Sequence, residues 1–296
     1  MSVEESKKIE KNKKSTTKQI SIFKGITAMP YRGSKWKFRN QIYEGLKGIK
    51  FDDDLKIYDL FGGSGALSII FKCILPKAKI ILNDYDQIIE KDGKNKVDES
   101  LILANNVLNE LKAILKPEDL EKDKIKNEQK VHKILDKYKE QLDEDVIARQ
   151  IVSANINFNG RYELRSSSYW NRFKKTDYDM YYHNFEGIKI IHKDYQEILN
   201  DKEIQEDKTE KLFLLDPPYL YTETTGYNMA YWKLSKYLYM LIYIFKHPQY
   251  KFILFEGKKS CLDDVFEFFQ ELETIKINYK RVPISKQEFM ILINFD

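Results

Sequence analysis

The chain has 296 residues, 42% of them hydrophobic, which is enough for the core of one large α/β domain with an insertion or of two modest domains. Its net charge of +4 is compatible with a nucleic-acid partner but does not require one. Its two cysteines, Cys73 and Cys261, and its isolated histidines lack metal-ligand spacing, which predicts a reduced cytoplasmic protein without disulfide or zinc.

A lysine-rich stretch, residues 1–20, opens the chain and has no apolar segment of the kind found in signal peptides. We expect it to be a disordered basic tail. Along the whole chain, no apolar run is long enough to span a membrane.

The first structured region, residues 21–86, has a strand–turn–helix–strand pattern. Residues 56–61 predict a strand, a glycine-rich turn leads into a helix near Ala66, and residues 79–82 predict a second strand that ends before Asn83. This is one βαβ unit of a parallel sheet.

The middle region, residues 87–186, has a different character. Apolar residues at helical spacing predict a helix that begins after Ser100, its N-cap, and a second helical stripe from Val131 to Leu142. Asn159 and Gly160 form a turn signal that can close a β-hairpin. We expect this region to be an inserted, mainly helical unit.

The α/β pattern returns in residues 187–296. Strands are expected at 188–191, 212–215 and 252–255, a helix at about 234–245, and a terminal antiparallel strand at 289–293. The sequence thus predicts one catalytic-type α/β domain, residues 21–86 and 187–296, interrupted by the middle region.

Asp216, Pro217, Pro218 and Tyr219 follow a buried strand. The two prolines fix φ and favour extended geometry in the residue before each of them, so the loop is rigid. A carboxylate and an aromatic ring held this way suit a flat, nitrogen-bearing ring. A plain strand exit with a Pro-Pro turn explains the four residues equally well when they are taken alone.

A second motif, residues 59–65, is a glycine-rich turn between a strand and a helix. Its spacing fits neither the dinucleotide fingerprint nor the phosphate loop. The acidic Asp59 before the turn would repel phosphate and suit an ammonium group. Taken alone, an ordinary strand–helix turn is an equal alternative.

Three further residues suit parts of the same ligand. Lys35, on a glycine turn, suits a carboxylate; Asp84, at a strand end, suits ribose hydroxyls; and Asp194 suits an adenine edge. Singly, each has a local explanation as a surface loop, a helix cap or a solvated acid. Together with Asp59 they describe S-adenosyl-L-methionine.

These motifs, in this order and with a long insertion before the Asp216 loop, resemble the Dam-type (alpha-group) adenine-N6 DNA methyltransferases from about Met29 onward. The resemblance implies a Rossmann-like S-adenosylmethionine-dependent methyltransferase sheet, mostly parallel with a terminal antiparallel strand, and an inserted target-recognition domain. It also implies methyl transfer to N6 of an adenine flipped out of double-stranded DNA.

The resemblance also implies roles for individual residues. Asp216 and the Pro217 carbonyl would accept the two N–H groups of the adenine amine, while Tyr219 would stack on the ring. Cofactor contacts would come from Tyr31, Lys35, Asp59, Phe61, Gly63, Asp84, Asp194 and Tyr195. DNA contacts would come from the aromatic and basic part of the insertion, through Asn159, Arg161, Arg165, Arg172 and Lys174, although any of its aromatic rings could instead build the insertion's own core.

Two departures from the family pattern limit the transfer. Glu256, Gly257 and Lys258 stand where the family usually has Ser-Asn, and the segment between Tyr219 and Trp232 matches poorly, so no target sequence is carried over. Rival functions are a methyltransferase for cytosine N4 or RNA adenine, a glutamine-modifying protein methyltransferase, and a DNA-binding protein with a decayed fold. We expect a monomer, and a cognate restriction endonuclease as a partner stays open.

Overall fold

The computed structural model describes residues 21–24, 26, 33–114, 124–145, 147–148, 152, 156–158, 162–164, 181–219, 233–257, 262–271 and 278–295. The predictions made above for several positions lie outside this part of the chain: those for residues 1–20, Tyr31, Asn159, Arg161, Arg165, Arg172 and Lys174.

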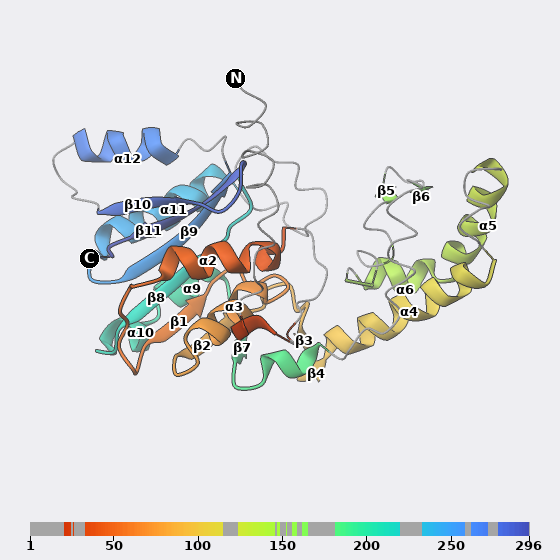
Figure 1. Ribbon diagram of the computed structural model, residues 1–296, viewed down its shortest axis with the longest axis horizontal. Coiled ribbons are helices and arrows are strands. Elements are labelled where there is room, and N and C mark those ends of the chain that lie inside the picture. The colour runs from red at the N-terminus through yellow and green to blue at the C-terminus, as the bar shows by residue number, and fades with distance from the viewer. Residues whose placement is uncertain are drawn as a thin grey trace, which may run out of the picture.

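A seven-stranded sheet, in the order β10-β11-β9-β8-β1-β2-β7, forms the α/β part of the molecule, which lies on the left in Figure 1. Neighbouring strands among β7, β2, β1, β8 and β9 are parallel, whereas β11 runs antiparallel to both β9 and β10. This confirms the Rossmann-like sheet with a terminal antiparallel strand. The strands are β1 (Lys56–Asp59), β2 (Lys79–Asn83), β7 (Lys189–Ile191), β8 (Lys211–Leu215), β9 (Lys251–Gly257), β10 (Tyr279–Pro283) and β11 (Glu288–Ile293).

Both faces of the sheet are covered, which explains the unbroken apolar run of β8. Leu212 and Leu214 pack into one core, and Phe213 and Leu215 pack into the other. The first core includes residues of α2 (Arg39–Leu46) and α3 (Ala66–Ile74). The second includes residues of α9 (Tyr195–Leu199), α11 (Leu234–Lys246) and α12 (Leu262–Glu271). The remaining short elements are η2 (Ser21–Phe23), η3 (Lys35–Phe38) and α10 (Lys202–Glu206), together with η5 (Tyr182–Phe185) at the end of the middle region.

In the middle region, the long helix α4 leads away from the sheet to α5, α6 and a small hairpin (Figure 1). The hairpin strands pair antiparallel, with Phe158 opposite Tyr162, which confirms the expected β-hairpin. The elements are β3 (Glu90–Lys91), β4 (Lys94–Asn95), α4 (Lys96–Ile114), α5 (Lys124–Lys137), α6 (Lys139–Glu144), β5 (Ile156–Phe158) and β6 (Tyr162–Leu164).

The expected start of the first insertion helix was wrong. The helix begins at Lys96, so Ser100 lies inside it, with its hydroxyl oxygen 2.8 Å from the Lys96 carbonyl oxygen. The N-terminal turn is closed earlier, because the Asn95 side chain accepts the Asp98 amide at 3.0 Å. The second apolar stripe is also divided, because α5 ends at Lys137 and α6 begins at Lys139.

The two ends of the middle region are tied together beside the sheet. Asp98 accepts hydrogen bonds from the amides of Tyr181 and Tyr182 at 3.1 and 3.4 Å. The Tyr182 hydroxyl donates to Glu90 at 2.9 Å. The chain therefore leaves and re-enters the sheet at neighbouring points. Within the described ranges, we find no helix that combines the length and the apolar character needed to cross a membrane.

Candidate active site

A cavity lies at the carboxyl ends of the parallel strands, where the strand order reverses between β1 and β8. The chain passes from β1 to β2 on one side of this point and from β8 to β9 on the other. Open α/β sheets bind ligands at such a point. The described lining consists of residues 33–35, 60–64, 83–86 and 216–219, with Ala66, Leu67, Ile88, Tyr195 and Glu288.

The glycine-rich turn after β1 forms one wall because its glycines permit close approach and unusual backbone angles. A Cβ atom on Gly62 would lie 2.1 Å from the Leu82 side chain and 2.9 Å from the Asn83 carbonyl oxygen. Gly65 has φ +70°, a left-handed conformation that glycine adopts without strain, directly before α3. The backbone of residues 60–64 thereby borders the cavity.

Asp59 lies beneath this turn rather than on the cavity wall. Its Oδ2 accepts the Ser68 hydroxyl at 2.7 Å, and its buried Oδ1 has no hydrogen-bond partner among the described residues. Burial raises the pKa of Asp59 to about 7, the Ser68 hydrogen bond opposes this, and the Asp216 charge adds to it. The ammonium-binding role stays a prediction, supported by an acceptor oxygen that still lacks a donor.

Asp84 lies on the wall and also organises the loop that follows it. The carboxylate is 1% exposed and accepts the amides of Ile88, Ile89 and Glu90 at 2.7, 2.8 and 2.9 Å. Burial raises its pKa, and the amide donors oppose that shift. A carboxylate has about four acceptor positions, so capping this loop leaves room for a ligand hydroxyl.

Asp194, expected at the adenine edge of the cofactor, and Tyr195, expected as a cofactor contact, are placed differently. Asp194 caps α9, accepting the Gln196 amide at 2.8 Å, and it is not among the described lining residues. Its adenine-edge role remains a prediction, and the helix cap, which was the local alternative, is present. Tyr195 does line the cavity, with its ring centre 5.2 Å from that of Phe61. Together the two rings form an aromatic wall suited to a flat ligand.

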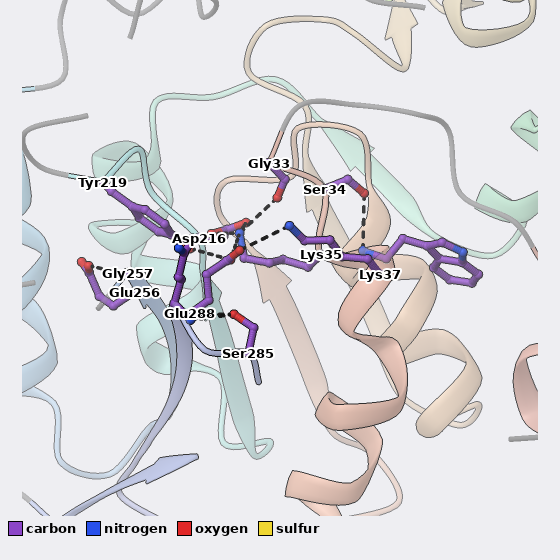
Figure 2. A network of polar contacts seen from close by, with 12 residues as sticks. Gly33, Ser34, Lys35, Lys37, Asp216, Tyr219, Glu256, Gly257, Ser285 and Glu288 are labelled. Atoms are coloured by element: carbon purple, nitrogen blue, oxygen red, sulfur yellow. Dashed lines mark hydrogen bonds and ion pairs between the residues drawn. The ribbon is translucent and has the colours of Figure 1, made fainter. Parts of the chain in front are cut away.

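The carboxylate of Asp216 is held by Lys35, which comes from the other end of the chain (Figure 2). The Lys35 Nζ atom lies 2.7 and 2.8 Å from the two Asp216 oxygens, and it donates to the Gly33 carbonyl at 3.1 Å. Burial raises the pKa of Asp216, the positive charge of Lys35 lowers it, and the negative charge of Glu288 raises it further. The structure therefore brings the cation expected to bind the cofactor into direct contact with the expected catalytic acid.

Tyr219 completes the loop after β8 and is anchored by its hydroxyl. The hydroxyl donates to Glu288 Oε2 at 3.1 Å. Burial raises the pKa of Tyr219 above its usual range, and the charges of Asp216 and Glu288 add to this effect, so the phenol stays neutral and can donate. Pro217 and Pro218 also lie on the cavity wall.

Glu288 was missed in the sequence as a site residue. The available signal was its place at the start of the terminal strand, directly opposite Gly257 in the departing Glu256-Gly257 segment. Glu256 itself is 3% exposed, accepts hydrogen bonds from the Tyr237 hydroxyl and the Gly257 amide, and is not among the lining residues. In the described part of the chain, no group of three or more His, Cys, Asp or Glu side chains is arranged to hold a metal ion.

Comparison with known proteins gives two findings. The family model of the D12 class N6 adenine-specific DNA methyltransferases matches residues 31–277. A protein of Haemophilus influenzae (strain ATCC 51907 / DSM 11121 / KW20 / Rd), named "Putative methyltransferase", is 31% identical over 234 residues, which cover 77% of this chain and 75% of that protein. The sheet order, the site at its reversal point and the extent of the family match agree with the Dam-type resemblance. This chain therefore belongs to the D12 class of N6 adenine-specific DNA methyltransferases.

Proposed function

We propose that this protein transfers a methyl group from S-adenosyl-L-methionine to N6 of an adenine that is flipped out of double-stranded DNA. The observation that carries the proposal is the position of Asp216. Its carboxylate, at the end of β8, lines the same cavity as the glycine-rich turn after β1. Asp216, which can accept hydrogen bonds from an amine, and the glycine-rich turn, which can hold a cofactor, therefore border the same cavity.

The residues of the cradle fit the proposed cofactor. S-adenosylmethionine carries an ammonium, ribose hydroxyls and a flat adenine. On the cavity wall, the remaining acceptor position of Asp84 suits the ribose and the rings of Phe61 and Tyr195 suit the adenine. The orphan oxygen of Asp59, which suits the ammonium, lies beneath the glycine-rich turn. Gly63, with φ +49°, exposes turn backbone to the cavity. When bound, the cofactor would supply a methyl group on a sulfonium, which is transferred as an electrophile.

The loop after β8 has the chemistry to activate the acceptor amine. The lone pair of an adenine amine is delocalised into the ring, so the nitrogen is a poor nucleophile. In our proposal Asp216 accepts one N–H and the Pro217 carbonyl accepts the other, which localises the lone pair toward the methyl donor. Tyr219 stacks on the adenine ring. Hydrogen bonds to an ionised carboxylate are roughly twice as strong as neutral ones, and preorganised acceptors contribute most where water is excluded.

Access to the base would come from the middle region. Flipping an adenine out of a duplex costs a few kcal/mol, which protein contacts must offset. We infer that residues 87–186 are the target-recognition domain and that Asn159, Arg161, Arg165, Arg172 and Lys174 contact DNA. We also infer that the protein acts as a monomer in the cytoplasm.

The test is methylation of duplex DNA with cofactor labelled in its methyl group, followed by chromatography of the nucleosides. The wild-type protein should yield N6-methyladenine, whereas N4-methylcytosine, labelled RNA only, or no product would contradict the proposal. Asp216→Ala should lower turnover by about 100-fold or more while cofactor binding measured by calorimetry persists. Asp264→Ala, at an exposed acid of α12, is the matched control. Turnover retained in Asp216→Ala would exclude the proposed role of that carboxylate.

A further inference from the structure

Glu288 lies on the cavity wall and is held there by the sheet. It is the first residue of β11 and pairs with Gly257 of β9. Its amide donates to the Ser285 hydroxyl oxygen at 2.9 Å, and its carbonyl accepts the Ser285 amide at 3.1 Å. A tight turn and a strand pairing therefore fix the origin of this side chain.

The Glu288 carboxylate contacts two other residues of the site (Figure 2). Its Oε2 accepts the Tyr219 hydroxyl at 3.1 Å and lies 3.6 Å from Lys35 Nζ. Its Oε1 lies 3.5 Å from Nζ of the exposed Lys37. With its side chain only 18% exposed, Glu288 links the ring that would stack on the base to the cation that holds Asp216.

The first link concerns the position of the Tyr219 ring. The ring lies beside Gly257, where an added Cβ atom would make an ordinary contact with Cδ2 at 3.4 Å, so the glycine itself leaves space there. The Tyr219 hydroxyl is held by Glu288 at the far end. The hydroxyl therefore anchors the ring, and misplacing a reacting group by about 1 Å can cost about 100-fold in rate.

The second link concerns the charge on Lys35. The Lys35 ammonium lies within 2.8 Å of both Asp216 oxygens, which occupies acceptor positions that an adenine amine would need. The Lys35 donors are directed at the two Asp216 oxygens and the Gly33 carbonyl, and Glu288, 3.6 Å away, is a second anion that attracts the same cation by its charge. The attraction of Glu288 for this cation weakens the hold of Lys35 on Asp216, so an incoming amine can displace it more easily.

We propose that Glu288 is a positioning residue of the methyl-transfer site. It fixes the Tyr219 ring through the hydroxyl, and it shares Lys35 with Asp216 so that Asp216 can accept the target amine. This inference rests on the proposed function. Glu288 acts through Tyr219 and Lys35 and does not itself touch the reacting atoms.

Two substitutions separate these links in steady-state methylation of duplex DNA. Glu288→Gln keeps an acceptor for Tyr219 but removes the charge, so kcat should fall roughly tenfold with the KM for DNA unchanged. Glu288→Ala removes both links, so the KM for DNA should also rise and kcat/KM should fall roughly 100-fold. Glu267→Gln, at an exposed acid of α12, is the matched control and should behave as wild type.

A second measurement does not depend on turnover. Duplexes with 2-aminopurine at the target position become more fluorescent when that base leaves the stack, so they report base docking. Tyr219→Phe keeps the ring and removes the hydroxyl, and it should lower the docking signal. Glu288→Ala should add little to that loss in the double variant, because residues that act through one contact are non-additive.

The outcomes are distinct. Wild-type kcat and KM in Glu288→Ala would overturn the inference, as would a docking loss in the double variant equal to the two single losses combined. If Glu288→Ala does not fold, as judged by thermal melting, a wild-type kcat in Glu288→Gln would overturn it. A wild-type protein that forms no N6-methyladenine would instead contradict the proposed function, and this is seen before any variant is made.

Discussion

At the scale of single residues, the buried carboxylate of Asp59 lowers the stability of the cofactor-free protein and suits a cationic group of the proposed cofactor. This carboxylate is fully buried, and one of its oxygens lacks a partner among the described residues. A buried charge of this kind is costly unless it is paired. The site therefore keeps an unfavourable group where a cationic ligand group is expected.

The cost of burying this charge leads to a prediction about the pH dependence of stability. The pKa of Asp59 is about 7 in the folded protein, above its ordinary value of 3.8. Below pH 3.8 the carboxyl is protonated in both states and does not destabilise the fold. As the pH rises through 7, the carboxyl ionises in the folded protein as well, and this stability is lost. Asp59→Asn resembles the protonated form. At pH 8 it should raise the free energy of unfolding of the cofactor-free protein by roughly 1–4 kcal/mol, with the gain shrinking toward pH 4.

Urea unfolding at several pH values measures this gain, and Asp264→Asn is the exposed control. Calorimetry should show that Asp59→Asn binds the cofactor more weakly. A variant that is less stable than the wild type at pH 8 would contradict the account of Asp59 as a destabilising buried charge.

Lys35 gives a second prediction, on the pH dependence of turnover. Burial raises the pKa of Asp216, and Lys35 opposes that rise by its charge and its hydrogen bond. In Lys35→Met only the raising effects remain, so ionised Asp216 should be lost at higher pH. The acidic limb of the kcat/KM profile should therefore move to higher pH, with a larger loss at pH 6 than at pH 9. Lys47→Met, at an exposed lysine beyond α2, is the control, and an unmoved limb would contradict the proposed effect of Lys35.

At the scale of elements, the turn from β1 into α3 depends on the shape of its glycines. A Cβ atom on Gly65 would lie 2.2 Å from the Phe185 ring, and Gly65 has φ +70°. Gly93 has the same φ, but a Cβ atom there would meet nothing within 4 Å. Substitutions at Gly65 and Gly93 therefore distinguish the cost of backbone strain from the cost of a steric clash.

We predict that Gly93→Ala costs about 1–2 kcal/mol, because it introduces only left-handed strain. Gly65→Ala should cost clearly more, since the Phe185 ring must also move. It should weaken cofactor binding as well, because the turn borders the cavity. Chemical denaturation and calorimetry measure the two effects, and equal stability losses for the two variants would show that the ring contact is unimportant.

The sequence predicted best those features that are determined by residues close together in the chain. The apolar runs of β8 and β9 and the glycine-rich turn are readable because burial and left-handed backbone restrict the residues allowed there. The edge strand β10 was missed because its side chains are only partly buried and it ends at Pro283. The start of α4 was misplaced at Ser100 because a serine followed by apolar residues at helical spacing looks the same inside a helix as at its N-cap.

The site was less predictable than the sheet, because its contacts join distant parts of the chain. Lys35 and Asp216 are 181 positions apart, and no local rule pairs them. Glu288 became visible as a site residue only when the register placed it opposite Gly257. Motifs thus identified the separate walls of the cavity, while the three-dimensional fold determined which charges meet inside it.

At the scale of the whole molecule, the proposal assigns DNA binding to the middle region. Replacing Arg165, Arg172 and Lys174 together by Ala should weaken duplex binding. The slope of log affinity against log salt should fall by about 0.9 for each phosphate that these side chains neutralise in the wild type. Fluorescence anisotropy at several salt concentrations measures both effects, with Lys47→Ala as a control. An unchanged slope would exclude binding of phosphates by these three residues, while cofactor binding should be unaffected in either case.

The tie between the two ends of the middle region has a consequence for how such proteins diversify. Because Asp98 holds the amides of Tyr181 and Tyr182, the chain between them closes on itself beside the sheet. The entropy of closing a loop grows only slowly with its length. A segment closed at its base in this way is interchangeable: its length and surface can change while β2 and β7 keep their parallel register. Under the proposed assignment of target recognition to this segment, new sequence preferences would arise by exchanging it, with the methyl-transfer chemistry left intact.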